Sequence, residues 1–359
     1  MNVFDKQQAL RFLEERRTWF AAAGNPVNPF ATFEWQHNFV EQIGESDWDF
    51  LFPTDVDGQS TMLLYRPPGG TVNALANYYA SLYSPLIGVG ADRAVSAEQL
   101  VDSLGRARPG IATVNLSPLD AASPDLASLK RAFAAQAWYV REYYCFGNWY
   151  LPCEGLQFDA YMQSRDSRLR NTWTRKAKKF YADSANRLEI ITAPADVDRG
   201  MDAYEQVYRK SWKNAEPYPG FIRQWVRICA ERGWLRLGLA CVGDVPVAAQ
   251  LWFTLNRRAY IFKLAYDEDY AQISAGTILT AEMFKMALDV DAVVEIDYLT
   301  GDDAYKKSWM SHRRERVGII ACNLRSVAGL VRAGRERLGA VKAAWQARRA
   351  LPASSVTEA

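Results

Sequence analysis

The segment Glu295–Trp309, with the sequence EIDYLTGDDAYKKSW, gathers residue types that acid–base and acyl-transfer chemistry needs. Asp297 ends a short apolar run that we expect to be a strand, and Gly301 permits a tight turn directly after it. Asp297 could hold or deprotonate an amine, Lys306 could stabilise an oxyanion, and Tyr305 could pass a proton. The alternative is a surface ion pair of little energetic value. Because exposed polar groups converge beside a glycine turn, we favour a catalytic role.

The loop Ser274–Thr277, with the sequence SAGT, is a candidate phosphate-binding site between an expected strand and an expected helix. Ser274 could cap the helix, and Gly276 lets the backbone approach a ligand closely. Helix N-termini with free N–H groups bind phosphate. A plain serine-capped turn explains the same residues, because the loop has only one glycine. Ser274, Ala275, Gly276 and Thr277 are therefore candidates for cofactor binding, and both interpretations stay open.

Lys263 lies within the apolar, aromatic run Ala259–Tyr266, which we expect to be a strand. Buried lysines are rare unless they are paired or functional. Strand residues alternate between two faces, so a side chain that points to solvent is the simpler explanation. The sequence leaves the choice between these two roles open.

The segment 156–187 is strongly basic, and we expect it to form a linker helix. Its cations could form a positive rim for the phosphates of a nucleotide donor or for an anionic acceptor. A solvated helix face is the alternative, and nucleic-acid binding is a weaker one because aromatic residues are few there. The cations are Arg165, Arg168, Arg170, Arg175, Lys176, Lys178 and Lys179.

Other familiar catalytic and metal-binding patterns are missing from the sequence. The only histidines, His37 and His312, lie far apart, which argues against a histidine-rich metal site and against a Ser-His-Asp or Cys-His nucleophile. The five cysteines form no C-x-x-C unit, and we interpret them as reduced thiols in a cytoplasmic protein. The N-terminus lacks a signal-peptide core, and no window of about 18 apolar residues could span a bilayer. The net charge of +2 gives no general preference for DNA or RNA.

The elements that must position these residues form a mixed α/β pattern in two halves of similar order. Each half begins with helices and continues with a hairpin, an aromatic strand, a helix and a further strand. We predict an N-terminal domain over residues 1–155, the linker helix over 156–187, a C-terminal domain over 188–324, and a basic helix with a disordered tail over 325–359. That last helix could lie on an anionic membrane surface, although a packed helix with a solvated face is the simpler interpretation.

Several segments resemble the C-terminal GNAT domain of the CelD/BcsL-type acetyltransferases, which are relatives of the FemAB peptidoglycan aminoacyltransferases. The resemblance rests on GDVPVAAQLWF, YIFKLAYDEDYAQISAGTIL and EIDYLTGDDAYKKSW, and it is best from about Arg168 to Lys307. It implies an α/β fold with a mixed sheet and tandem GNAT-like domains, of which the first is degenerate.

In such folds two central strands diverge, and the pantetheine arm of the donor lies between them. By this resemblance the diverging strands are Ala259–Tyr266 and Val293–Tyr298. A backbone N–H group near Lys263, Leu264 or Ala265 would polarise the thioester carbonyl.

The resemblance also implies that the loop at 274–277 holds the pyrophosphate of an acyl-CoA, with acetyl-CoA as the first choice and no metal. The usual loop, Q/R-x-x-G-x-G/A, is matched only in part, because Gly276 is displaced by one position and Thr277 stands at the second small position. Trp309 and Arg175 are expected to contact the substrate.

These expectations combine into an N-acyltransferase that moves an acyl group from acyl-CoA to an amine acceptor. The resemblance suggests an amine of a sugar nucleotide, a polysaccharide precursor or another cell-envelope intermediate. One alternative is a transferase that uses aminoacyl-tRNA, with the linker helix on the tRNA. The other is a non-catalytic binding subunit of an exopolysaccharide assembly.

Overall fold

The structure is a computed structural model, and it describes residues 3–23, 28–107 and 110–350. Its strands form one twelve-stranded mixed sheet in the order β1-β2-β3-β4-β5-β12-β6-β11-β10-β9-β8-β7. Neighbouring strands are antiparallel except for the parallel pairs β4 with β5 and β10 with β11. The strands are β1 (Val3–Phe4), β2 (Asp49–Leu51), β3 (Leu64–Arg66), β4 (Val72–Ala74), β5 (Thr113–Asp120), β6 (Trp138–Pro152), β7 (Arg187–Ile191), β8 (Leu235–Val242), β9 (Val245–Leu255), β10 (Arg258–Tyr266), β11 (Glu295–Asp297) and β12 (His312–Asn323).

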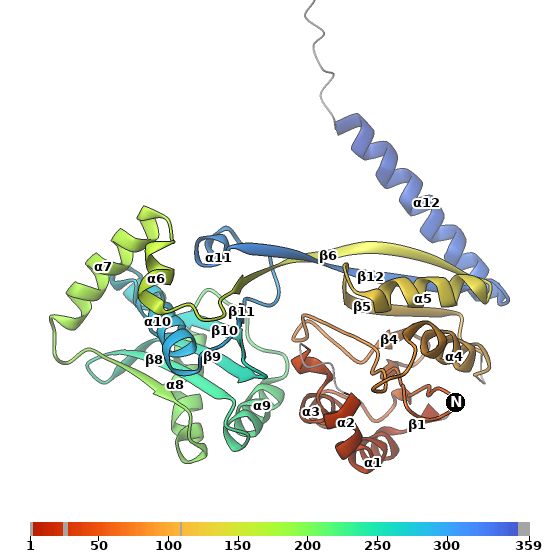
Figure 1. Ribbon diagram of the computed structural model, residues 1–359, viewed down its shortest axis with the longest axis horizontal. Coiled ribbons are helices and arrows are strands. Elements are labelled where there is room, and N and C mark those ends of the chain that lie inside the picture. The colour runs from red at the N-terminus through yellow and green to blue at the C-terminus, as the bar shows by residue number, and fades with distance from the viewer. Residues whose placement is uncertain (1–2, 24–27, 108–109, 351–359) are drawn as a thin grey trace, which may run out of the picture.

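The helices cover both faces of this sheet and confirm the predicted mixed α/β class. The last helix, α12, extends away from the rest of the molecule (Figure 1) and corresponds to the predicted C-terminal basic helix. The helices are α1 (Lys6–Glu15), α2 (Arg17–Ala23), α3 (Phe33–Gln42), α4 (Arg93–Gly105), α5 (Pro124–Ala135), α6 (Phe158–Gln163), α7 (Ser167–Tyr181), α8 (Val197–Arg209), α9 (Pro219–Glu231), α10 (Ala275–Lys285), α11 (Ala304–Trp309) and α12 (Val327–Ala350).

Two long strands, β6 and β12, join the halves of the chain, and Figure 1 shows them crossing from one lobe to the other. They pair in antiparallel fashion from His312 opposite Tyr150 to Asn323 opposite Trp138. Strand β12 follows the C-terminal half in sequence, yet it lies between β5 and β6 of the N-terminal half. The boundary predicted at residue 324 therefore falls after a strand that hydrogen-bonds to the first half, and the division into domains stays a prediction.

The two halves also share a hydrophobic core. Trp35 on α3 lies edge-on against Phe221 and Trp225 on α9, with ring centroids 5.0 Å and 4.9 Å away. The buried amide of Asn38 donates to the carbonyl oxygen of Phe221 across 3.1 Å. Burial of several large aromatic rings strongly favours association of the lobes. This packing places the Tyr78–Tyr79 turn against the C-terminal half.

The predicted linker helix is divided in two. Helix α6 ends at Gln163, and α7 begins after the N-cap Asp166, whose carboxylate accepts the N–H of Leu169 across 2.7 Å. The aspartate cap satisfies a free N–H of the first turn and so fixes a new helix start. The predicted disordered tail at 351–359 lies outside the described residues.

None of the helices in the described residues combines the length and the apolar content that crossing a bilayer requires.

Candidate functional site

Strands β10 and β11 part in the middle of the sheet. They pair in parallel at Arg258 with Glu295, Ala259 with Ile296 and Tyr260 with Asp297. Beyond Tyr260, β10 continues to Tyr266 while β11 ends. This agrees with the divergence that the resemblance implied. The free edge of β10 leaves backbone groups that a bound extended chain could pair with.

A β-bulge lies at the point where the strands part. The register of β10 against β9 shifts between Ile261 and Lys263, so that Phe262 has no partner of its own on β9. Bulges change the direction of side chains and are common beside active sites. The shift explains why consecutive residues of β10 face one cavity.

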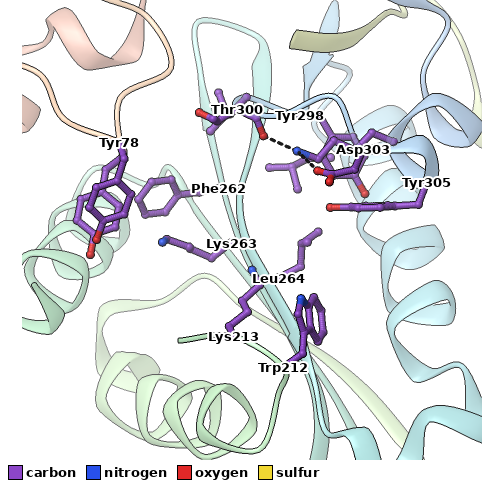
Figure 2. A pocket seen from close by; sticks show the side chains of 14 residues that line it. Tyr78, Trp212, Lys213, Phe262, Lys263, Leu264, Tyr298, Thr300, Asp303 and Tyr305 are labelled. Carbon is purple, nitrogen blue, oxygen red and sulfur yellow. Dashed lines mark hydrogen bonds and ion pairs between the residues drawn. The ribbon is translucent and has the colours of Figure 1, made fainter. Parts of the chain in front are cut away.

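A cavity of about 310 Å³ lies beside this gap, and Figure 2 shows the side chains that surround it. Its walls come from β10, from the turn after β11, from α11, from the loop after α8, and from the N-terminal half. The lining residues are Tyr78, Tyr79, Trp212, Lys213, Ile261, Phe262, Lys263, Leu264, Tyr298, Leu299, Thr300, Asp303, Tyr305 and Lys306.

Lys263 is a paired lysine that lines this cavity with a side chain only 13 % exposed, and the solvent-facing alternative is wrong. Its Nζ lies 2.6 Å from a carboxylate oxygen of Glu216 and 4.5 Å from the ring centroid of Tyr79. The hydroxyl of Tyr79 donates to Glu216 across 2.8 Å. Burial lowers the pKa of Lys263, and the contact with Glu216 opposes that shift. Burial also opposes ionisation of Glu216, yet Lys263 and the hydroxyl groups of Tyr208 and Tyr79 together outweigh it and lower the carboxyl pKa.

Lys306 lies on α11 at another wall of the cavity and is 5 % exposed. Its Nζ donates to the carbonyl oxygen of Thr300 and lies 3.2 Å from the Asp303 carboxylate. Figure 2 draws both interactions as dashed lines. Burial lowers the pKa of Lys306, and Asp303 opposes the shift. Tyr305, which is 47 % exposed, lies edge-on to the Tyr298 ring, and burial of its hydroxyl raises its pKa. The predicted neighbours Tyr305 and Lys306 therefore both face the cavity.

Lys213 is the third lysine of the cavity. Within the described residues, no carboxylate lies within ion-pair distance of its Nζ. Burial, and next the positive charge of Lys263, lower the pKa of Lys213 to about 8. The lysine therefore contributes a positive charge that the protein itself does not neutralise by direct contact.

Asp297 lies outside the cavity, in contrast to the predicted role as a base or amine anchor. It is 3 % exposed and accepts hydrogen bonds from Asn148 Nδ2 at 2.6 Å, from the Leu299 N–H at 2.7 Å and from Arg314 Nη2 at 2.5 Å. A carboxylate with three donors has little capacity left to bind a substrate amine. Its hydrogen bond to Leu299 instead fixes the turn that carries Thr300, and Thr300 in turn holds Lys306.

Two residues that we expected to contact substrate lie elsewhere. Trp309 is buried in the core, with its ring 5.1 Å from Phe284, and its carbonyl oxygen accepts the hydroxyl of Tyr161 at 2.7 Å. Arg175 is exposed on α7 and does not line the cavity. The sequence of the short helix that contains Lys306 does not reveal which of its sides packs inward, so Trp309 was assigned to the wrong face.

The loop Ser274–Thr277 begins α10, as predicted, but Ser274 does not cap it with its side chain. Its φ of +61° is left-handed, and its carbonyl accepts the N–H groups of Thr277 and Ile278. This leaves the amides of Ala275 and Gly276 as first-turn donors for a ligand. The loop does not line the cavity, so a donor would have to extend from it along β10.

Sequence reasoning missed the contributions of Tyr78, Tyr79, Trp212, Lys213 and Glu216. Tyr78 and Tyr79 lie in a turn of the N-terminal half. The segment SWKNAEPYP, which includes Trp212 and Glu216, combines aromatic, charged and proline residues after a helix. That composition is a signal for a functional loop. No pattern within it could have predicted contact with β10 or with the first half.

Comparison with known proteins identifies the fold around this cavity. Residues 167–307 match the family model described as an acetyltransferase (GNAT) domain. The structure of FemX is similar over 90 % of this chain and 98 % of that chain, with 10 % identity and a TM-score of 0.59. The C-terminal domain of a putative lysylphosphatidylglycerol synthetase from Agrobacterium fabrum covers 90 % of this chain and 95 % of its own, with 13 % identity and a TM-score of 0.55.

The C-terminal half of the chain therefore contains a GNAT-type acetyltransferase domain. L-PGS from Bacillus licheniformis is also similar, over 90 % of this chain and 94 % of that chain, with 11 % identity and a TM-score of 0.55. A search of curated protein sequences finds no match. The similarities to FemX and to the synthetase domain extend over both halves of this chain, and the tandem arrangement of GNAT-like units stays a prediction. Within the described residues, no group of three or more histidine, cysteine, aspartate or glutamate side chains could hold a metal ion.

Proposed function

We propose that this protein is an N-acyltransferase whose reaction takes place in the cavity between β10 and α11. The observation that carries the proposal is the parting of β10 and β11 beside a cavity of about 310 Å³ that three lysines line. An acyl donor with an extended amide arm fits the free edge of β10, because its amides can pair with backbone groups there. The acceptor amine then approaches from the cavity side.

The reaction forms a bond between the amine nitrogen and the acyl carbon and breaks the bond from that carbon to the thioester sulfur. The amine loses a proton, and the departing sulfur gains one. Lys306 can stabilise the negative oxygen of the transition state, because the Thr300 turn holds its ammonium at the cavity wall. Tyr305 keeps its proton at neutral pH and can relay one from the amine to the sulfur.

The donor that we propose is an acyl-CoA, with acetyl-CoA as the first choice. The first-turn amides of Ala275 and Gly276 fit a pyrophosphate. A Cβ on Gly276 would approach only Tyr266, at 3.8 Å, so the backbone there is open to a ligand. CoA would supply the activated thioester, and the acceptor would be an amine of a sugar or a cell-envelope precursor, as the family resemblance suggests.

The exposed cations of α7 favour a second candidate, an aminoacyl-tRNA donor. Lys176 from α7 donates to the carbonyl oxygen of Gln272 beside the phosphate loop, so this helix borders the donor side of the site. A polyanion on that surface would release many counterions, and its affinity would fall steeply with salt. The exposed basic residues are Arg168, Arg170, Arg175, Lys178 and Lys179.

Thermal unfolding with added ligands tests the donor. Acetyl-CoA at about 100 times its dissociation constant should stabilise the protein by about 2.7 kcal/mol, with little dependence on salt. Stabilisation by tRNA that disappears between 50 mM and 200 mM salt would favour the second candidate instead. If neither ligand changes the unfolding temperature, the proposal of a transferase fails and a non-catalytic binding subunit becomes the better interpretation.

A further inference from the structure

The cavity contains one more positive than negative side chain. Its cations are Lys213, Lys263 and Lys306, and the carboxylates in contact with them are Glu216 and Asp303. Each carboxylate forms an ion pair with one lysine, so the excess charge lies on Lys213. An ammonium acceptor without a charge of opposite sign would enter against this repulsion.

Within the described residues, aromatic rings and no ion-paired carboxylate lie against the ammonium of Lys213. Its Nζ lies 5.6 Å from the ring centroid of Trp212 and 5.9 Å from that of Tyr208. In Figure 2, Lys213 and Trp212 lie on the side of the cavity opposite Thr300 and Asp303. A ligand group on Lys213 would therefore be separated from the reacting atoms near Lys306. That separation suits a group that recognises the substrate and does not react.

We propose that the acceptor carries an acidic group, a carboxylate or a phosphate, and that Lys213 binds this group while the amine reaches the acyl carbon. The inference rests on the proposed function and specifies its substrate class. The acid neutralises the excess charge and gives Lys213 the hydrogen-bonded partner that the described part of the chain does not supply.

The acyl donor is a less suitable source of the anion at Lys213 than the acceptor is. The free first-turn amides at Ala275 and Gly276 are already suited to its phosphates, and neither residue lines the cavity. Trp212 is exposed beside Lys213, so an acceptor can reach the lysine from solvent. The anion and the donor phosphates thus occupy separate places in the proposed complex.

Calorimetric binding at pH 7 to the full chain and to two variants tests the inference. Glycine is compared with glycinamide for the carboxylate, and glucosamine 6-phosphate with glucosamine for the phosphate. For at least one pair, the acidic member should bind the wild type about 10-fold more tightly, as one charged hydrogen bond predicts. Lys213→Met should remove this preference. Lys307→Met, which changes an exposed lysine outside the cavity, should keep it.

The pH dependence gives a second measure of the same contact. The groups that influence Lys213 are Lys263 and Glu216 first, and then Lys306 and Asp303. Because the pKa of free Lys213 is about 8 and an anion favours its charged form, affinity should be constant well below pH 8. Above that pH it should fall by up to about tenfold per unit, and the fall should be absent in Lys213→Met.

The outcomes separate this inference from the proposed function. If no thioester is consumed, but acidic probes still bind through Lys213, the transferase proposal fails and Lys213 remains an anion-binding group. If thioester is consumed and the acidic and neutral amines bind equally well, the acidic-acceptor inference is overturned. It is also overturned if Lys213→Met weakens only acetyl-CoA binding, because the anion then belongs to the donor.

Discussion

Two clusters of charged side chains lie near the turn after β11, and they differ in net charge and in access for a ligand. Around Asp297, the three carboxylates of Asp120, Glu295 and Asp297 are matched by the guanidinium groups of Arg258, Arg314 and Arg316. The cavity has three lysines and only two carboxylates. The first cluster is neutral by this pairing and is closed, whereas the second is positive and open.

The difference shows how the same residue types can serve two purposes. Arg314 bonds to Asp297 and to Glu295 at 2.5 Å and 3.0 Å, and these contacts join β12 to β11. A satisfied network of this kind fixes a strand arrangement and offers a ligand few free groups. In the cavity, the unmatched charge of Lys213 has a cost in the free protein that a ligand can remove. We infer that the first cluster supports the turn and that the second recognises substrate.

The largest effect is expected when the closed cluster loses its central cation. Arg314→Met leaves two buried carboxylates short of a partner, and it should lower the free energy of unfolding by about 3–5 kcal/mol. Urea denaturation measures the change. Arg313→Met on the same strand is the matched control, because its partner Asp302 is exposed, and its cost should be much smaller. Equal losses in both variants would contradict the distinction between buried and surface pairs.

The next effect tests catalysis in the open cluster. Lys306→Met should lower kcat for acyl transfer about 100-fold, because one preorganised donor to the oxyanion is lost. Steady-state rates with acetyl-CoA and an amine measure this change. Lys307→Met on the same helix should keep the wild-type rate. A rise in KM at constant kcat would instead assign Lys306 to binding of the substrate in its ground state.

The Asp297→Asn variant tests whether Asp297 fixes the turn after β11 or acts as an acid or base in the reaction. The substitution removes the negative charge that Arg314 and Asn148 contact, and it should cost about 2 kcal/mol of stability. The rate should fall less than about tenfold, with an unchanged pH profile, because Asp297 acts only through the turn. Loss of about 100-fold or more in rate, together with loss of one limb of the pH profile, would restore Asp297 as the base.

The smallest effect concerns the free energy of unfolding, which the unpaired charge of Lys213 is expected to lower. Lys213→Met should raise the free energy of unfolding at pH 7 by about 1–2 kcal/mol. The pKa of Lys213 is about 8 in the folded protein and 10.5 in the reference state, so the unfolded chain binds more protons between these values. Wild-type stability should therefore rise with pH across this window, and the advantage of the variant should disappear near pH 10.5. Urea denaturation at pH 7, 9 and 10.5 measures both trends, and a variant less stable than the wild type at pH 7 would contradict them.

Local patterns in the sequence were sufficient to predict much of the secondary structure around the cavity. The apolar run that contains Lys263, the strand that ends at Asp297 and the helix that follows SAGT all form close to where we predicted them. Strand alternation, glycine turns and apolar helix faces are local signals, because each depends on neighbours only a few residues away. The family resemblance added the divergence of the two central strands.

The direction of individual side chains was less predictable. Asp297 and Lys306 were expected to act together, but a single turn separates them, and one faces a closed network while the other faces the cavity. Trp309 follows on the same helix and packs inward. A strand end contains polar groups for support as well as for chemistry, and their local sequence does not distinguish the two uses.

The sequence by itself determined the fold class, the central strands, and Tyr305 and Lys306 as cavity residues. Only the tertiary structure added Tyr79, Lys213 and Glu216, which come from distant segments and meet β10 through packing of the two halves. It also decided which charges are matched, because the side-chain partners of Asp297 lie on β6 and β12. The physical reason is that secondary structure depends on near neighbours, whereas the net charge of a cavity depends on every segment that the fold brings together.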